Sequence, residues 1–511
     1  MAEPLRIPWP MWKCHYFLLG GNRKMGPLAG ILPIALLVGY FGFQRILYPQ
    51  PVAGWALNFL AGAQAFLLVI GGCNAVYRAM LRDYESKMIE SHRLTPMSNS
   101  AVAVGYLFGA TLQVLLIYAI VFVFGALLSW FSAGVPTAWM VGNIVLLNGA
   151  LTLWAIVVFT GMRPAKPISP AGPIVGVAAF ANAGLLMVPG VGIMLSAYSS
   201  ALGLGLMWGL IGLNAPGTLA LLLVQLVLTA YWVAAAAAKY RRPDLPALNA
   251  ARGTVLLCLW LLFASLGMVA FDLLATTAAI SRGDRPAEAV QWSITLILSL
   301  FVALAPLNGS VHCRILALRG ASLRGWGDRF PDWATAVLAA TLIVGVMFLL
   351  GAPVWRPILT QVCQYKTAAP PSNAELLQFF ATRWAATFLA CLFAMLSVRA
   401  VLAMAYVLTR SPKLTTGVFI FVAWILPPGI DVSLAAAFAD FSESIDLSVA
   451  FGCSALGTVL LVWHDLPGPL GPGLIVQAAL ALVLSFFAAR TLRKLSGATT
   501  APPAAKAVSA A

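Results

Sequence analysis

Long apolar runs without charged residues recur along the whole chain and constrain its fold more than any other feature. Residues 55–77 and 216–238 are two such runs, and neither contains Asp, Glu, Lys or Arg. Uncharged apolar runs of about 18 residues or more are typical of transmembrane α-helices, whereas membrane β-barrels show short alternating segments. Only 9% of the 511 residues are charged, against about 25% in soluble domains. The sequence therefore predicts an all-α, polytopic transmembrane helical bundle.

The chain is strongly basic, with 31 Lys and Arg residues against 16 Asp and Glu residues and a formal net charge of +15. In a soluble protein, such a balance would indicate nucleic-acid binding. Here the basic residues cluster at the ends of apolar runs, as in "KYRR" at 239–242. Basic residues at span ends set topology and contact anionic lipid. We therefore expect the lipid bilayer as a partner, and no nucleic acid.

Residue types that carry catalysis or bind metals are scattered. The seven cysteines form no CxxC pair and the four histidines lie far apart, so the sequence predicts no metal site and no catalytic residues. No lysine follows a glycine, which excludes the Gly-Lys-[Ser/Thr] pattern of a phosphate-binding loop. We expect a protein that is not an enzyme and that binds no cofactor itself.

The positive-inside rule orders the first apolar runs into one unit with a cytoplasmic N-terminus. The predicted spans are 26–47, 55–77, 100–130, 138–161, 173–194 and 216–238, the first being a retained span rather than a signal peptide. If the run 197–213 also crossed, the basic residues 239–242 would lie outside. We therefore expect a re-entrant segment on the outer side, where irregular backbone is buried in protein or lines a cavity.

A second unit repeats this layout. Its predicted spans are 254–280, 291–311, 333–354, 377–398, 414–430 and 472–489, and the short run 447–463 is again expected to be re-entrant. The closing spans of both units begin with Pro-Gly, contain Val-Gln and end in basic sequence. Internal repeats are common in transporters. We predict about twelve spans as two tandem six-span units, 1–245 and 246–498, with a disordered tail at 499–511.

A charged segment, 78–95, separates the second and third predicted spans. Its apolar residues recur at helical spacing and form one stripe: Tyr77, Leu81, Tyr84 and Met88. On the polar side, Asp83 is spaced to pair with Lys87, and Glu90 with Arg93. This pattern predicts an amphipathic helix lying flat at the cytoplasmic face.

The end of this helix is predicted from a proline. Thr95 precedes Pro96 and is therefore disfavoured in helical conformation, so the helix ends there. Ser98, Asn99 or Ser100 can cap the next span. We expect a sharp corner at the membrane surface.

The sequence "ESKMIESHRLTPMS" (85–98) resembles the coupling segment of type-2 ABC transporter permeases. That family carries an acidic residue, a hydrophobic-Glu pair and then Leu-Thr-Pro-hydrophobic-Ser between its second and third spans. The matching positions are Glu85, Glu90, Leu94, Thr95, Pro96 and Ser98. The chain departs from the family at Met88 and Ile89, where Gly-Thr is usual. The resemblance covers about 25 residues sharply, and the six-span layout extends it over 1–242.

The resemblance implies the membrane subunit of an ABC exporter in a bacterial inner membrane, with both termini cytoplasmic. A separate cytoplasmic ABC ATPase would use ATP and dock on the coupling helix 78–95, through Glu85, Glu90 and the flanking Arg82 and Arg93. Pro96 would set the angle at which movement enters the third span. The substrate is not identified by the sequence; the apolar interior favours an amphipathic or lipid-like molecule. One fused chain or a homodimer could form the pore.

Three alternatives stay open at this stage. The basic loop 313–333 either docks a second ATPase or is a plain cytoplasmic loop. Arg399 either lies at the inner surface or is an intramembrane polar residue that faces a partner group or an anionic substrate. Finally, an integral membrane scaffold could use the same helix 78–95 to recruit a soluble partner without transport.

Overall fold

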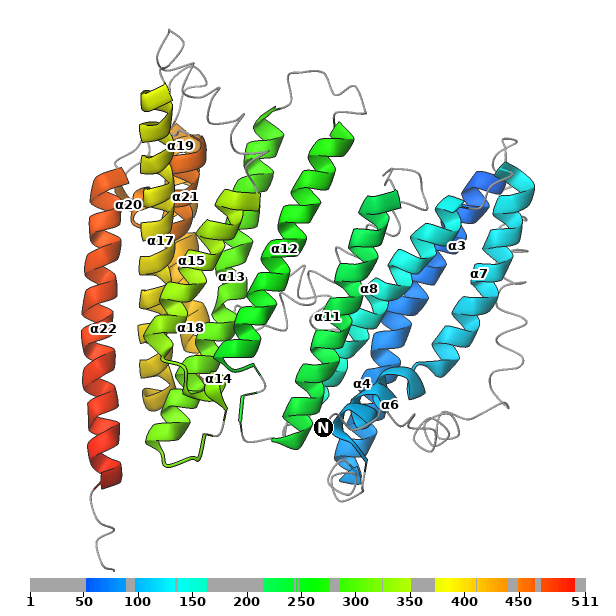
Figure 1. The fold of residues 1–511 in the computed structure, drawn as a ribbon, viewed down its shortest axis with the longest axis horizontal. Coiled ribbons are helices and arrows are strands. Elements are labelled where there is room, and N and C mark those ends of the chain that lie inside the picture. Colours follow the sequence, from blue (N-terminus) through cyan, green and yellow to red (C-terminus); the bar gives the residue numbers. More distant parts are fainter. Residues whose placement is uncertain are drawn as a thin grey trace, which may run out of the picture. The chain divides into compact units, whose positions relative to one another are not determined.

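The structure, a computed structural model, is built of helices (Figure 1). It describes residues 52–88, 97–133, 137–162, 215–242, 245–246, 248–275, 285–323, 325–350, 373–409, 411–438, 449–464 and 470–500. No strand occurs in these ranges, so the all-α prediction is confirmed for them. Nine of the helices described are long and apolar enough to cross a bilayer. The predicted total of about twelve spans remains a prediction.

The described helices fall into two compact units, of which the first ends with α11 and the second begins with α12. The helices of the first unit are α3 (Val52–Phe66), the π-helical segment η1 (Leu67–Gly72), α4 (Cys73–Glu85), α6 (Asn99–Gly109), α7 (Leu112–Ala133), α8 (Thr137–Gly161) and α11 (Ala215–Arg241). The predicted spans 26–47 and 173–194 and the re-entrant run 197–213 lie outside the described residues.

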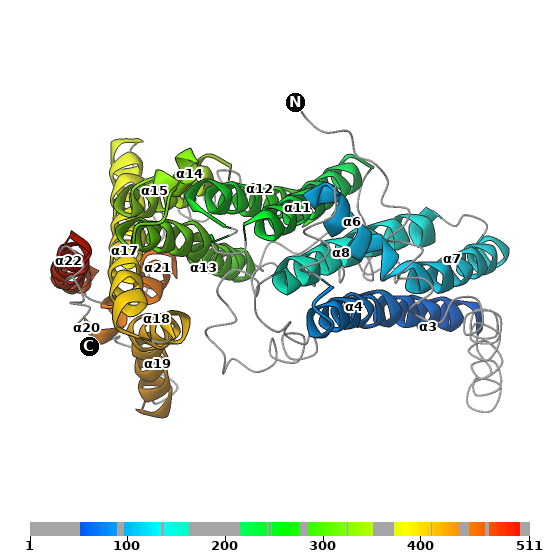
Figure 2. The same cartoon turned by 90° about the horizontal axis from the view of Figure 1, so that it is seen from below.

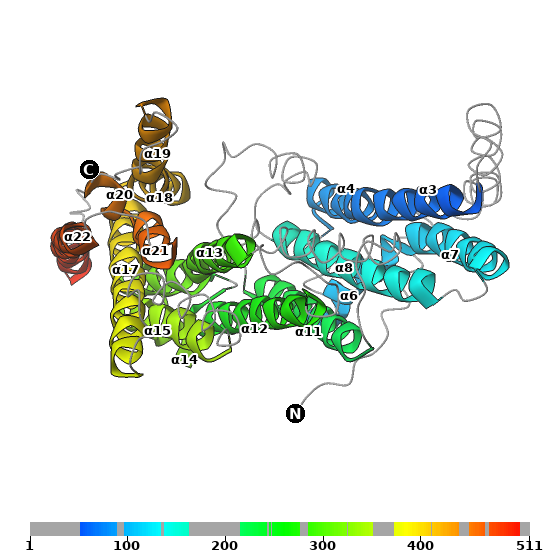
Figure 3. The same ribbon diagram turned by 90° about the horizontal axis from the view of Figure 1, so that it is seen from above.

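Helix α8 forms the centre of the first unit, between the α3–α4 rod and α11 (Figures 2 and 3). Its Trp154 is fully buried and donates its indole N–H to the carbonyl of Leu68, at 2.8 Å. On the other side, Gln225 of α11 donates to the carbonyl of Val145 at 3.1 Å. Buried side-chain hydrogen bonds therefore connect α8 to both of these neighbours.

The rod α3–η1–α4 continues through a π-helical stretch. Each break in the ordinary helical pattern leaves backbone groups to be satisfied, and here the indole of Trp154 binds the carbonyl of Leu68 within that stretch. Gly72 makes the approach possible, because a Cβ atom there would lie 2.2 Å from the indole nitrogen of Trp154. The contact between Gly72 and Trp154 thus fixes how closely the second and fourth predicted spans approach each other at this point.

The second unit contains the remaining helices. They are α12 (Ala250–Ala275), α13 (Arg285–Leu318), α14 (Trp326–Arg329), α15 (Asp332–Leu350), α17 (Asn373–Leu408), α18 (Pro412–Ile420), η3 (Phe421–Ile425), α19 (Leu426–Phe438), α20 (Val449–Gly452), α21 (Ala455–His464) and α22 (Leu470–Thr500). Helix α17 packs against α13, α15, α18, α21 and α22, so it is the central element of this unit (Figure 3). Helix α22 extends to Thr500, two residues into the predicted tail, and the remainder of the tail lies outside the described residues.

The short predicted segment 447–463 is a broken pair of helices, α20 and α21. The longer one, α21, has 10 residues and is therefore about 15 Å long, half of the hydrocarbon core of about 30 Å. The amide of Gln477 on α22 donates to the carbonyls of Gly452 and Ser454, at 2.8 and 3.1 Å. These bonds satisfy the carbonyls that the break exposes, as backbone at this depth requires. The length favours a segment that does not cross completely.

Candidate functional site

The corner after α4 is the position that the sequence singled out. The structure shows no helix beginning at residue 78, because α4 is the direct continuation of α3 and η1. The helix ends at Glu85, where Ser86 and Lys87 form a turn and Lys87 adopts a left-handed conformation with φ 58°. A residue in this conformation ends a helix. The prediction of one uninterrupted helix over 78–95 therefore fails at Ser86 and Lys87.

Asp83 is buried rather than part of the polar face. Its exposed fraction is 4%, and it accepts a hydrogen bond from the hydroxyl of Tyr106 on α6, at 2.5 Å. The buried face of α4 consists of Val76, Ala79, Met80 and Asp83, with Cys73 at its start. The structure thus gives Asp83 a partner on the next helix in place of the predicted Lys87.

The predicted coupling residues divide into two groups. Arg82 and Glu85 are exposed on the last turn of α4, and Ser98 is the N-cap of α6. The hydroxyl of Ser98 accepts from the N–H of Ala101 at 3.2 Å, which confirms the predicted cap. Glu90, Arg93, Leu94, Thr95 and Pro96 lie outside the described residues.

This geometry ties both ends of the 86–98 connection together. The Asp83–Tyr106 bond joins residues 23 positions apart, one on the helix that enters the corner and one on the helix that leaves it. A buried hydrogen bond of a carboxyl group is among the stronger side-chain contacts. This bond therefore joins α4 and α6 directly at the corner.

Removing the hydroxyl of Tyr106 should weaken this corner. We expect Tyr106→Phe to lower the free energy of unfolding by about 2 kcal/mol, because the carboxyl group of Asp83 keeps its burial and loses its donor. Denaturant unfolding of the purified protein in detergent measures this loss. The matched control is Tyr118→Phe, since the buried hydroxyl of Tyr118 donates to a neutral acceptor, the carbonyl of Asn143, at 3.1 Å. A loss for Tyr106→Phe no larger than that of the control contradicts the role of Asp83.

The second unit has a corner at the corresponding position, between α13 and α15. Asp332, the first residue of α15, is 1% exposed and lies between two arginines. Arg399 of α17 donates its Nε–H to one carboxylate oxygen at 2.9 Å, and Arg314 of α13 binds the other oxygen. Arg399 is thus paired with an acidic residue at the end of a span, and its own side chain is 12% exposed.

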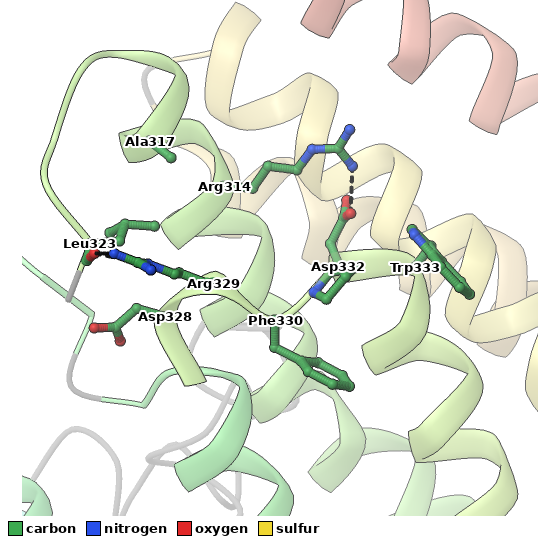
Figure 4. Close-up of a pocket in the computed structure, with 9 residues that line it drawn as sticks. Arg314, Ala317, Leu323, Asp328, Arg329, Phe330, Asp332 and Trp333 are labelled. Carbon is green, nitrogen blue, oxygen red and sulfur yellow. Dashed lines mark hydrogen bonds and ion pairs between the residues drawn. The ribbon is translucent and has the colours of Figure 1, made fainter. Parts of the chain in front are cut away.

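Beside this cluster lies a cavity of about 360 Å³ (Figure 4). Its wall includes Arg314 and Asp332 and, from the 313–333 loop, Asp328, Arg329 and Trp333. The guanidinium of Arg329 donates to the carbonyl of Leu323 at 2.8 Å, which shapes the loop around the hollow. The 313–333 loop therefore lines an open cavity whose wall carries both charged and apolar side chains.

The chain matches no family model, no curated protein and no solved structure. The assignment of a function therefore depends on the residues of these two corners.

The chemistry at both corners is that of buried hydrogen bonds and ion pairs at helix ends. Within the described ranges, no group of three or more His, Cys, Asp or Glu side chains is placed to hold a metal ion. The polar side chains that come together there are carboxyl groups paired with a phenol or with guanidinium groups. Such pairs fix helix ends relative to one another.

Sequence reasoning missed Asp83, Tyr106 and Asp332 as structural residues. Asp332 could have been found, because an acidic residue at the first turn of a span, close in sequence to Arg314, is placed for an ion pair at a helix end. Tyr106 left no such signal. A tyrosine within an apolar helix is common, and its partner is fixed only by the fold.

Proposed function

We propose that this protein is the membrane-spanning permease subunit of an ATP-driven ABC exporter. Its spans, about twelve, form two tandem six-span units with outer re-entrant segments, in a bacterial inner membrane with both termini cytoplasmic. A separate cytoplasmic ABC ATPase docks on the corner after α4 and supplies the energy. The cargo belongs to the amphipathic or lipid-like class, and the chain itself carries no ATPase site.

The observation that carries this proposal is the buried bond between Asp83 and Tyr106. It fastens the start and the end of the charged corner, whose exposed Arg82 and Glu85 face away from the packed helices. A soluble motor that moves this corner would move two spans as one body. A loop that only connects spans has no need of such a bond, so the arrangement favours force transmission.

Packing within each unit supports the proposed repeat. The closing span contacts the fourth span of its unit in both cases, as α11 with α8 and α22 with α17. The second span contacts the third and fourth spans in both cases: α3 with α7 and α4 with α8 in the first unit, and α13 with α15 and α17 in the second. Several of the contacts between spans are therefore shared by the two units.

The first experiment is co-purification of the detergent-solubilised protein with the ATPase encoded beside its gene. We expect stable binding by the wild type and at least a tenfold loss, about 1.4 kcal/mol or more, for the Glu85→Ala/Glu90→Ala double variant. The control is Asp431→Asn, which removes an acidic charge from α19, far along the chain from the corner.

Two results would count against the proposal. Binding that survives the double variant would remove the coupling role from Glu85 and Glu90. Failure of the wild type to bind any ATPase would favour the scaffold function, in which the corner recruits a soluble partner and no transport follows.

A further inference from the structure

The cavity at the α13–α15 corner of the second unit is lined by two arginines and two aspartates, Arg314, Arg329, Asp328 and Asp332. Its wall holds the guanidinium groups of Arg314 and Arg329, and Trp333 stands at its side (Figure 4). Its volume of about 360 Å³ is at the lower end of ligand pockets, about 300–1,000 Å³, and therefore suits a small polar group. We propose that this cavity binds the phosphate headgroup of an anionic phospholipid.

The charges at the corner favour an anion. Three guanidinium groups lie at the corner against two carboxylates, because Arg399 adds to the two arginines of the cavity wall. Asp332 pairs with both Arg314 and Arg399 and therefore cannot neutralise both. Arg329 is engaged by a neutral carbonyl, that of Leu323, at 2.8 Å through Nη2. The corner therefore retains a net positive charge. Guanidinium groups present forked donors that match a phosphate group, so the excess charge has the right chemistry.

Arg314 is suited to hold the phosphate. Its side chain is 42% exposed, although it is anchored on Asp332, which is 1% exposed. A guanidinium group has five N–H donors, and in the described part of the chain Arg314 uses one nitrogen, Nη1, for Asp332. Arg314 is part of the cavity wall. The ion pair with Asp332 thus orients the guanidinium before any ligand arrives.

The position of the cavity favours a lipid over a free anion. It lies at the ends of two candidate spans, Thr295–Leu318 and Asp332–Leu349, and therefore at the boundary between hydrocarbon and water. Trp326 and Trp333 are 72% and 56% exposed there. Exposed tryptophans at helix ends are typical of the headgroup level of a bilayer, and basic pockets between spans bind anionic headgroups. Trp333 is placed to contact the acyl side of a bound lipid.

The wall of the cavity is rigid. Asp328 accepts from the amide of Asn249 at 2.7 Å and from the N–H of Gly325 at 3.3 Å, which fastens the α14 turn to the start of α12. Gly327 lies so close to α12 that an added Cβ atom would be 2.6 Å from the Cβ of Ala251. A preformed wall lowers the cost of ordering the loop on binding. The lipid site is independent of the transport function proposed above.

The test uses the full chain in detergent and counts bound lipid by native mass spectrometry. The probes are phosphatidylglycerol, phosphatidylcholine and inorganic phosphate. We expect one phosphatidylglycerol to bind in preference to phosphatidylcholine, and Arg329→Gln to weaken its binding about fivefold, as for one basic contact of about 1 kcal/mol. Arg314→Lys retains the charge and the ion pair with Asp332 but loses the fork, and it should also weaken binding.

The matched control is Arg319→Gln. Arg319 belongs to the same loop, and it donates to the carbonyl of Tyr406 at 3.3 Å instead of lining the cavity. Phosphatidylglycerol binding should be unchanged in this variant. Equal losses for Arg319→Gln and Arg329→Gln would overturn the proposal, because general surface charge would then explain the binding. If inorganic phosphate displaced bound phosphatidylglycerol as effectively as added lipid does, the cavity would be assigned to a free anion. If no lipid bound at all, the lipid site would be overturned in favour of an acidic protein partner.

Discussion

Replacing Asp332 with alanine is expected to lower the free energy of unfolding by about 3–5 kcal/mol, because removing one partner of a buried ion pair leaves an uncompensated charge. Asp332 is 1% exposed and is the common partner of Arg314 and Arg399, so the variant leaves two guanidinium groups without their carboxylate. Denaturant titration of the purified protein in detergent, followed by circular dichroism, measures the loss.

Two further variants make the result specific. Asp328→Asn changes the other carboxyl group of this corner, whose partners are neutral, and should cost only about 1 kcal/mol. Adding Arg399→Met to Asp332→Ala removes the less exposed of the two orphaned charges, and we expect it to recover part of the lost stability. Additive losses in the double variant would contradict the ion-pair account.

Replacing Trp154 with alanine is expected to cost about 3–5 kcal/mol, the usual range for a large aromatic side chain in a core. Trp154 is fully buried, and its indole also donates to the carbonyl of Leu68 at 2.8 Å. Trp154→Phe keeps most of the volume and loses the donor, so we expect a loss of about 1–2 kcal/mol for it. Thermal and denaturant unfolding in detergent measure both variants.

Gly72 provides an independent check on the same contact. Gly72→Ala alone should destabilise the protein, because its Cβ atom would lie 2.2 Å from the indole nitrogen of Trp154. In the Gly72→Ala/Trp154→Ala double variant the added methyl group enters the space left by the indole. We therefore expect the double variant to be more stable than the sum of the single losses indicates, by about 1 kcal/mol or more. Strict additivity would show that the two residues do not meet.

The spans that could be predicted are those whose sequence is apolar and uncharged throughout. The prediction 138–161 corresponds to α8, Thr137–Gly161, and the prediction 216–238 to α11, Ala215–Arg241. Neither apolar run contains a charged residue. The first ends at Gly161, and the second is followed by the basic residues of 239–242. Length and hydropathy alone determine such a helix in a bilayer, so no knowledge of the tertiary structure was needed.

Prediction failed where a tertiary contact overrides the local pattern. Asp83 looks like one half of a surface pair with Lys87, but the partner that the fold provides is Tyr106 on another helix. The third predicted span, 100–130, divides into α6 and α7 around Ala110 and Thr111 although the sequence there is continuously apolar. The hydroxyl of Thr111 bonds the carbonyl of Leu107 at 2.6 Å, a bond of the kind that often bends helices.

The helix predicted for the connection after the second span is interrupted, and the role of this connection as a functional site stays a prediction. The sequence pattern identified the connection after the second span, and Ser98 caps the following helix as predicted. The turn at Ser86 and Lys87 was missed, because a left-handed lysine has no distinctive sequence pattern. For Arg399, the sequence left its partner open, and the partner is Asp332, 67 residues earlier in the chain.

The π-helical stretch Leu67–Gly72 determines the rotational phase of everything that follows it in the rod. A π-helical turn accommodates one residue more than an α-helical turn, and each residue of an α-helix rotates the chain by about 100°. If the same residues were wound as a regular α-helix, the extra residue that the π-helical turn accommodates would instead rotate α4 by that angle. Asp83 would then no longer face Tyr106, although neither residue had been changed. The alignment of the corner after α4 therefore depends on an irregularity within the helix that leads to it.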